Sequence, residues 1–139
     1  MSLRGKHILI IEDNVLNRVV YQITLGVEGA NLVFDRKGRD AIVQLQMSLD
    51  WDLIILDLML YGGISGFDVF KDIRALPAYN HVPIVAVSAS DPSTAIPKAR
   101  ELGFSGFISK PINESLICSQ LEAIIAGEHI WHDGTLVDT

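Results

Sequence analysis

The segment Leu53-Ile54-Ile55-Leu56 constrains the fold more than any other part of this chain, because it is continuously apolar and a carboxylate, Asp57, follows it directly. A short apolar run without polar alternation is typical of a strand buried on both faces, as in a parallel sheet. A loop with three glycines follows, from Leu58 to Gly66. We therefore expect Asp57 at the carboxyl end of a buried strand, which is the edge where open α/β sheets bind their ligands.

The composition limits the class of protein. With 139 residues, 49% of them hydrophobic and 20% charged, the chain fits one globular domain with its own core. The net charge of -6 offers no basic surface for nucleic acid. The one cysteine, Cys118, rules out an internal disulfide, and no apolar run approaches the roughly 20 residues that span a bilayer. We expect a cytoplasmic protein that binds neither membranes nor nucleic acid directly.

Four other segments have the composition of strands, and each strand is followed by a segment of helical periodicity. The additional strands are predicted at residues 7–11, 30–34, 83–88 and 106–109. Strands that alternate with helices in this way predict a doubly wound α/β fold around a parallel sheet of five strands.

The first two predicted helices have clear apolar stripes. Asn14 is placed to cap the first helix, and Gly29 follows it. We expect that helix to pack on the sheet through residues that recur every four positions, namely Val15, Val19, Ile23 and Val27. A second helical stripe extends from Gly38 to Leu49.

The three later helices differ in how clearly their ends are marked. One is predicted from Gly66 to Ala75, and the last begins at a cap, Asn113, and ends at Gly127. Between them, Pro97 either starts a short helix or interrupts a longer one. Residues 127–139 are assigned to a C-terminal tail or the start of a linker, and residues 1–5 to an N-terminal lead-in.

Polar side chains follow four of the predicted strands, and a parallel sheet brings all of its carboxyl ends to one edge. The residues concerned are Glu12, Asp13, Asp57, Ser88 and Lys110. Carboxylates held close together repel one another, and a divalent cation such as Mg²⁺ relieves that repulsion. A carboxylate beside Mg²⁺ can act as a nucleophile towards a phosphoryl group, with the ammonium and hydroxyl groups stabilising its oxygens.

Four short motifs at these strand ends resemble the receiver domain of two-component response regulators. They are Ile11-Glu12-Asp13-Asn14, Ile55-Leu56-Asp57-Leu58-Met59, Val87-Ser88-Ala89 and Ser109-Lys110-Pro111-Ile112. Each motif is weak alone, but all four occur in order and at the family's spacing. The resemblance covers residues 6–126 and implies a flavodoxin-like (βα)5 fold whose parallel strands have the order 2-1-3-4-5.

The resemblance also assigns roles to individual residues. It implies that Asp57 is the phosphoacceptor and that Lys110, before a cis bond to Pro111, binds the phosphoryl oxygens. Ser88 is similar to the switch hydroxyl of the family and Phe107 to its switch aromatic. The Mg²⁺ site implied by the resemblance consists of Glu12, Asp13, Asp57 and the main-chain carbonyl of Met59.

A receiver of this kind is a signalling switch and not an enzyme with a free substrate. The resemblance implies that a sensor histidine kinase or a histidine phosphotransfer protein donates its phosphoryl group to Asp57, and that the surface of helix four, strand five and helix five then changes. The same resemblance implies a downstream protein target and allows a homodimer that forms on phosphorylation.

Two features depart from the family pattern. Tyr61 stands where a proline is usual, and Gly66 follows Asp57 by nine residues, so that the loop is one residue longer than usual. Pro97 falls in helix four, which commonly contacts partners.

Three other functions stay open from the sequence. The chain could be a receiver-like interaction module that is never phosphorylated. A flavodoxin-like FMN protein would need a phosphate loop after the first strand, where Glu12 and Asp13 would repel the phosphate. A phosphatase resembling the haloacid dehalogenases would need a second aspartate where Met59 stands.

Overall fold

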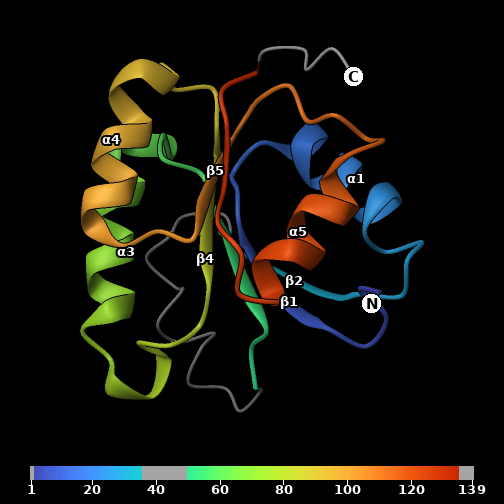
Figure 1. Ribbon diagram of the computed structural model, residues 1–139. Coiled ribbons are helices and arrows are strands. Elements are labelled where there is room, and N and C mark those ends of the chain that lie inside the picture. The colour runs from blue at the N-terminus through green and yellow to red at the C-terminus, as the bar shows by residue number, and fades with distance from the viewer. Residues whose placement is uncertain (1, 36–49, 135–139) are drawn as a thin grey trace.

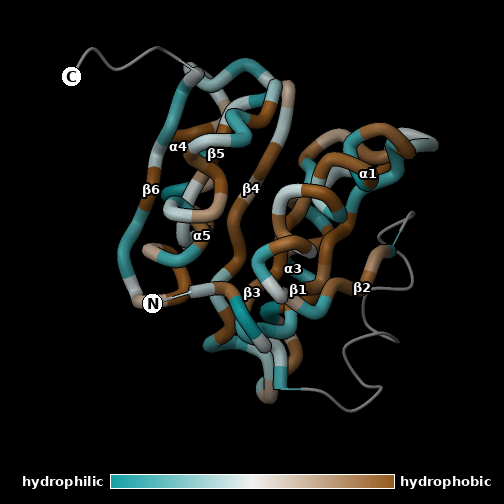
Figure 2. The backbone as a smooth tube through the Cα atoms, turned by 90° about the vertical axis from the view of Figure 1, so that its right-hand side faces the viewer, coloured by the Kyte–Doolittle hydropathy of each residue, from teal (hydrophilic) through white to brown (hydrophobic). Residues whose placement is uncertain are grey.

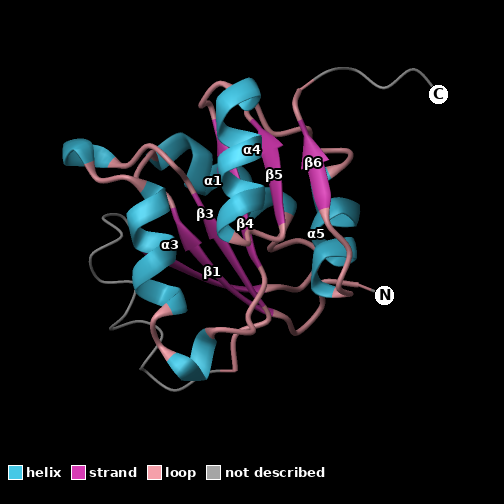
Figure 3. Cartoon of the chain, turned by 60° about the vertical axis from the view of Figure 1, so that its left-hand side comes forward, coloured by secondary structure: helices cyan, strands magenta, loops and turns pink. Residues whose placement is uncertain are grey.

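A parallel sheet forms the middle layer of the protein (Figures 1 and 3). The computed structural model describes residues 2–35 and 50–134, so the helix predicted between Gly38 and Leu49 lies outside the described residues. Within the described residues the sheet has six strands in the order β2-β1-β3-β4-β5-β6. Their bounds are β1 His7–Ile11, β2 Asn31–Asp35, β3 Leu53–Leu56, β4 Ile84–Ser88, β5 Gly106–Ser109 and β6 Ile130–His132.

The predicted order of the first five strands is confirmed, and every pair of neighbours is parallel. Each residue of β3 and β4 is buried, as expected for strands covered on both faces, and most of β4 is hydrophobic (Figure 2). The prediction of five strands was incomplete, because Ile130–His132, within the segment assigned to the tail, forms β6 beside β5. Three residues are too few to show a strand period in the sequence.

Helices cover the two faces of the sheet, and each face has its own core (Figure 1). On one face, α3 (Gly66–Arg74) and α4 (Pro92–Leu102) pack over β3, β4 and β5. On the other face lie α1 (Val15–Thr24) and α5 (Ile117–Ile125). In the described part of the chain, no helix is both long enough and apolar enough to cross a membrane.

Local sequence signals account for where most of these helices begin. The side chain of Asn14 caps α1 by accepting a hydrogen bond from the amide of Asn17, and Ser65 caps α3 in the same way through Phe67. For α4 the longer of the two alternatives is correct, because the helix begins at Pro92 and contains Pro97. Asn113 accepts bonds in a turn that precedes α5, and the helix itself starts later, at Ile117.

The prediction for α1 was wrong about which side of the helix packs on the sheet. The expected stripe is exposed: the exposed fraction is 60% for Val15, 41% for Val19 and 61% for Ile23. Tyr21 and, in the turn after the helix, Leu25 are fully buried instead. Both sides of the helix carry apolar residues at helical spacing, so spacing alone does not tell which side faces the sheet.

Tyr21 gives a test of this packing. Its side chain is fully buried, its hydroxyl has no hydrogen-bond partner among the described residues, and burial raises the pKa of its phenol well above the ordinary value. An unsatisfied buried hydroxyl costs free energy, so we expect Tyr21→Phe to increase the free energy of unfolding by about 1 kcal/mol at pH 7. Urea denaturation of the two proteins measures this difference.

The same substitution has a pH dependence of known sign. Because the folded state keeps the proton of Tyr21, the unfolded state of the original protein gains stability as the pH rises above its own tyrosine pKa of about 10. The stability advantage of the Tyr21→Phe protein should therefore grow above that pH. A Tyr21→Phe protein that is less stable than the original, both at pH 7 and in this alkaline range, would contradict the buried, unpartnered hydroxyl.

Candidate functional site

Three carboxylates meet at the carboxyl edge of the sheet because of the pairing of two strands. In the register of β1 with β3, Ile11 is opposite Leu56, so Glu12 and Asp57 leave the two strands side by side. The amide of Asp57 donates to the carbonyl of Ile11 across this pair. Oxygen atoms of Glu12, Asp13 and Asp57 all lie within 4.8 Å of one another. The expectation that these acids come together is therefore met by the geometry.

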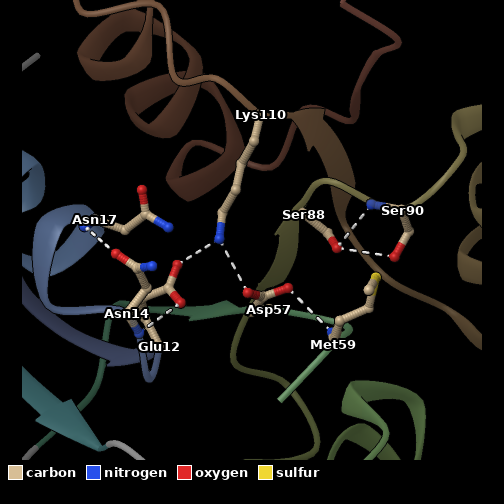
Figure 4. A network of polar contacts seen from close by, with 8 residues as sticks. All are labelled: Glu12, Asn14, Asn17, Asp57, Met59, Ser88, Ser90 and Lys110. Atoms are coloured by element: carbon tan, nitrogen blue, oxygen red, sulfur yellow. Dashed lines mark hydrogen bonds and ion pairs between the residues drawn. The ribbon is translucent and has the colours of Figure 1, made fainter. Parts of the chain in front are cut away.

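Lys110 bridges two of these acids (Figure 4). It follows β5, which is separated from β3 by β4 in the sheet. Its Nζ is 2.5 Å from Oε1 of Glu12 and 2.9 Å from Oδ2 of Asp57. The lysine follows β5, so the contact joins three strand ends that are far apart in the sequence. Its peptide bond to Pro111 is cis.

At this site, burial and the charge of the bridging partner shift the pKa values of Glu12 and Lys110 in opposite directions. Burial raises the pKa of Glu12 above its ordinary value, although Lys110 acts in the opposite direction. Burial would lower the pKa of the Lys110 ammonium, but the hydrogen bonds to Glu12 and Asp57 and their charges raise it overall. The ammonium therefore stays charged at neutral pH, and it faces more negative charge than it can neutralise.

The remaining oxygens of the two bridged acids are held by main-chain amides. The amide of Met59 donates to Oδ1 of Asp57 over 3.0 Å, and the amide of Asn14 donates to Oε2 of Glu12 over 3.2 Å. Asp57 is 6% exposed and Glu12 is 1% exposed, whereas Asp13 is half-buried. Asp57 is thus oriented at both oxygens and still reachable from solvent.

The loop after Asp57 is closed by its own hydrogen bonds. The amide of Leu60 donates to Ile64 and the amide of Gly66 to Leu58, and a short 3-10 helix, Tyr61–Gly63, forms the tip. A Cβ atom on Gly66 would overlap the carbonyl oxygen of Asp57, so only glycine allows this approach. The residues of this tip, Tyr61–Gly63, are exposed.

Ser88 lies at the same edge, but its hydroxyl does not contact the acids in this structure. Its Oγ is 2.9 Å from Oγ of Ser90 and accepts a bond from the Ser90 amide (Figure 4). Ser90 was not among the predicted site residues. The spacing of two residues between the hydroxyls, directly after a strand, was the available signal. The role of Ser88 as a switch stays a prediction.

Phe107, the predicted switch aromatic, is fully buried in the core under α4. It lies in the middle of β5, two residues before Ser109 and three before Lys110. Its mobility, and the Met59 carbonyl as a metal ligand, stay predictions.

The donor set at this edge suits a hard divalent cation. Carboxylate oxygens are the ligands that Mg²⁺ prefers, and a half-buried Asp13 leaves room for the water molecules that Mg²⁺ usually keeps. The excess of carboxylates over ammonium groups gives the cation an electrostatic reason to bind.

Comparison with known proteins agrees with this geometry. A family model described as Response regulator receiver domain matches residues 8–122, most of the chain and all of the strand ends that form the site. The chain belongs to this receiver domain family.

The receiver domain has relatives of two kinds. It is 31% identical over 108 residues to the Polar-differentiation response regulator DivK of Brucella ovis, covering 78% of this chain and 86% of that protein. It is 27% identical over 143 residues to Probable histidine kinase 4 of Oryza sativa subsp. japonica, covering 88% of this chain. The chain spans 14% of the length of that kinase and 12% of Probable histidine kinase 5 from the same plant.

A solved structure supports the fold. The receiver domain of a sensor histidine kinase from Pseudomonas aeruginosa PAO1 superposes with a TM-score of 0.78 at 24% identity, covering 88% of this receiver domain and 99% of that chain. That structure has a magnesium ion coordinated in its active site cleft.

Proposed function

We propose that this receiver domain is a phosphorylation switch in which Asp57 accepts a phosphoryl group from a phosphohistidine, with Mg²⁺ as cofactor. The observation that carries the proposal is the position of Asp57. Its carboxylate is nearly buried, lies beside two further carboxylates and contacts the Lys110 ammonium at 2.9 Å. A carboxylate that can act as a nucleophile, oxygen ligands for a cation and an ammonium counter-charge thus lie at one place.

The proposed transfer follows from these contacts. An Asp57 oxygen forms a bond to phosphorus while the bond from phosphorus to the donor histidine nitrogen breaks. The electron pair of that bond returns to the ring, and the donor histidine, protonated on its other ring nitrogen, leaves as neutral imidazole. The Met59 amide holds the second oxygen of Asp57 during attack. Lys110 leaves Glu12 and turns to the phosphoryl oxygens, whose negative charge it stabilises. When bound, Mg²⁺ supplies positive charge that offsets the repulsion between the carboxylates and the phosphoryl group.

The exposed side of α1 offers a docking surface for the phosphodonor. Exposed apolar residues at helical spacing follow the site directly, beginning with Val15 and Leu16 and continuing with Val19 and Ile23. The hydrophobic colour of much of α1 can be followed in Figure 2. Monomeric proteins rarely leave such a stripe uncovered, and continuous apolar patches mark interaction surfaces. We propose that a histidine kinase or histidine phosphotransfer protein packs on this stripe and so brings its phosphohistidine to Asp57.

The switch output is proposed to be a change between two packings of the domain. Phosphate contacts to Ser88 and Lys110 would favour a second arrangement of β4, α4 and β5. The domain assists its own phosphorylation and later hydrolysis of the acyl phosphate, and turns over no free substrate.

Among the alternatives, only the receiver-like module without phosphorylation is close to this proposal. It would lack one of the charged groups, whereas Glu12, Asp13, Asp57 and Lys110 are all present and adjacent. The FMN alternative is disfavoured because a phosphate after β1 would meet Glu12 and Asp13.

Phosphorylation is tested with a small phosphodonor. Incubation with acetyl phosphate and Mg²⁺ should add one phosphoryl group, detected by intact-mass spectrometry, because the donor needs no docking surface. Chelation of Mg²⁺ should abolish the gain, and Asp13→Asn should slow it by at least about 10-fold through loss of a ligand. Asp57→Asn should show no gain, while Asp91→Asn, which changes an acid outside the site, should behave as the original. A gain that persists in Asp57→Asn would refute the proposal.

The docking surface is tested by comparing a protein phosphodonor, which has to dock, with acetyl phosphate, which does not. Val19→Asp should lower the rate of transfer from a phosphorylated histidine phosphotransfer protein by at least about 10-fold, since it puts a charge into an apolar contact, and should leave the rate from acetyl phosphate unchanged. Rapid-quench kinetics with both donors measure the two rates.

Val27→Asp is the matched control. Val27 is 81% exposed but follows the far end of α1, a helix about 14 Å long by its rise per residue. Its substitution should affect neither donor. Equal loss in Val19→Asp and Val27→Asp, or no loss in either, would show that the partner docks elsewhere.

A further inference from the structure

Strand β6 covers the edge of the sheet that β5 would otherwise present (Figure 3). The strand follows α5 and runs parallel to β5, with Ile130 opposite Gly106, Trp131 opposite Phe107 and His132 opposite Ile108. The edge of β5 is therefore occupied by the chain's own C-terminal segment. Nothing in the proposed phosphotransfer uses this strand.

Trp131 is the main anchor of β6. Its ring packs against the core beneath α4, on the same side of the sheet as its neighbour Phe107. The guanidinium of Arg100, on α4, lies 4.7 Å from the centre of the indole. The tryptophan thus joins β6 to both β5 and α4.

A glycine on β5 permits this close approach. A Cβ atom on Gly106 would lie 2.5 Å from the carbonyl oxygen of Ile130. The main chains of β5 and β6 are in direct contact here, because Gly106 has no side chain between them. The packing of β6 therefore depends on the position of the β5 backbone.

Other features make β6 easy to detach. It has three residues, all half-buried, whereas the central strands are fully buried. Nδ1 of His132 is buried without a hydrogen-bond partner in the part of the chain that the structure describes, which lowers the stability of the attached strand. Gly127, with a φ of 102°, precedes it in the connection from α5. Short elements with few buried contacts open at the lowest free energy in a protein.

β5 connects this strand to the candidate phosphorylation site. Lys110 follows β5 and holds Glu12 and Asp57, and its amide donates to the carbonyl of Ser88. The residue opposite His132 is Ile108, two positions before Lys110. Lys110 therefore lies two residues beyond the part of β5 to which the end of β6 is paired.

We propose that β6 is a detachable cover of the β5 edge, held while Lys110 bridges Glu12 and Asp57 and released when Asp57 is phosphorylated. This inference rests on the function proposed above. In the structure with the lysine bridge, β6 fits β5 closely; when Lys110 moves to phosphoryl oxygens, that fit is lost. Release exposes the edge of β5 and the apolar surface under Trp131, and only the phosphorylated form exposes them.

Hydrogen exchange of the full chain tests the coupling. With Mg²⁺ and beryllium fluoride, which stands in for the phosphoryl group, the amides of residues 128–134 should exchange about 10-fold faster than with Mg²⁺ alone. Amides of β1 and β3 should exchange at the same rate in both conditions. Unchanged or slower exchange of residues 128–134, with the fluoride complex present, would overturn the proposal.

The two proposals fail in different ways in this experiment. Fluorine NMR reports directly whether the beryllium fluoride complex forms at Asp57, with Asp57→Asn as the blank. A missing fluorine signal would overturn the phosphoacceptor function and the coupling with it. A fluorine signal without faster exchange would overturn the coupling alone.

Two substitutions on α4 supply a matched pair. Arg100→Gln removes the cation over Trp131, and Lys98→Gln removes a cation of the same charge over Phe67, which lies on α3. Because coupling is reciprocal, Arg100→Gln should raise the exchange of residues 128–134 with Mg²⁺ alone and should tighten beryllium fluoride binding. Lys98→Gln should change neither. Faster exchange in Arg100→Gln without tighter binding would show that the release of β6 is not coupled to Asp57, and would overturn the proposal.

Discussion

The contact of the Lys110 ammonium with the carboxylates of Glu12 and Asp57 is the interaction on which the rest of this site depends. Buried carboxylates are costly without a counter-charge, and one lysine offsets two of them here. The contact also joins residues 98 and 53 positions apart in the sequence, so it can form only after β1, β3 and β5 have taken their places in the sheet. The site therefore forms only when the sheet has formed.

The same contact gives the site its proposed ability to switch. An ammonium that is shared by two carboxylates can move to a third anion without losing all of its partners. Both carboxylate oxygens of Asp57 are already held by hydrogen bonds, one from Lys110 and the other from the Met59 amide. The proposed phosphorylation then changes which anion the lysine contacts, and this change is the local event that β5 can pass on to its neighbours.

The sequence predicted the sheet well because buried parallel strands are continuous apolar runs, and it predicted the acidic cluster because parallel strands bring their ends together. The sequence did not predict which side of α1 packs on the sheet, because both sides carry apolar residues at helical spacing. Only the structure shows that Tyr21 packs inward while Val19 is exposed. The sequence also missed β6, whose attachment comes from the approach of Ile130 to Gly106 and not from any periodicity. The partnership of Ser88 with Ser90 is likewise a matter of side-chain orientation.

The most direct test of this account is a crystal structure of the chain with Mg²⁺ and beryllium fluoride. We expect beryllium to be bonded to an oxygen of Asp57, the metal to be bound by Asp13 and Asp57, and Nζ of Lys110 to have moved from Glu12 to a fluoride. Lys110 still bridging Glu12 and Asp57 while the fluoride occupies another position would contradict the central role given to this lysine.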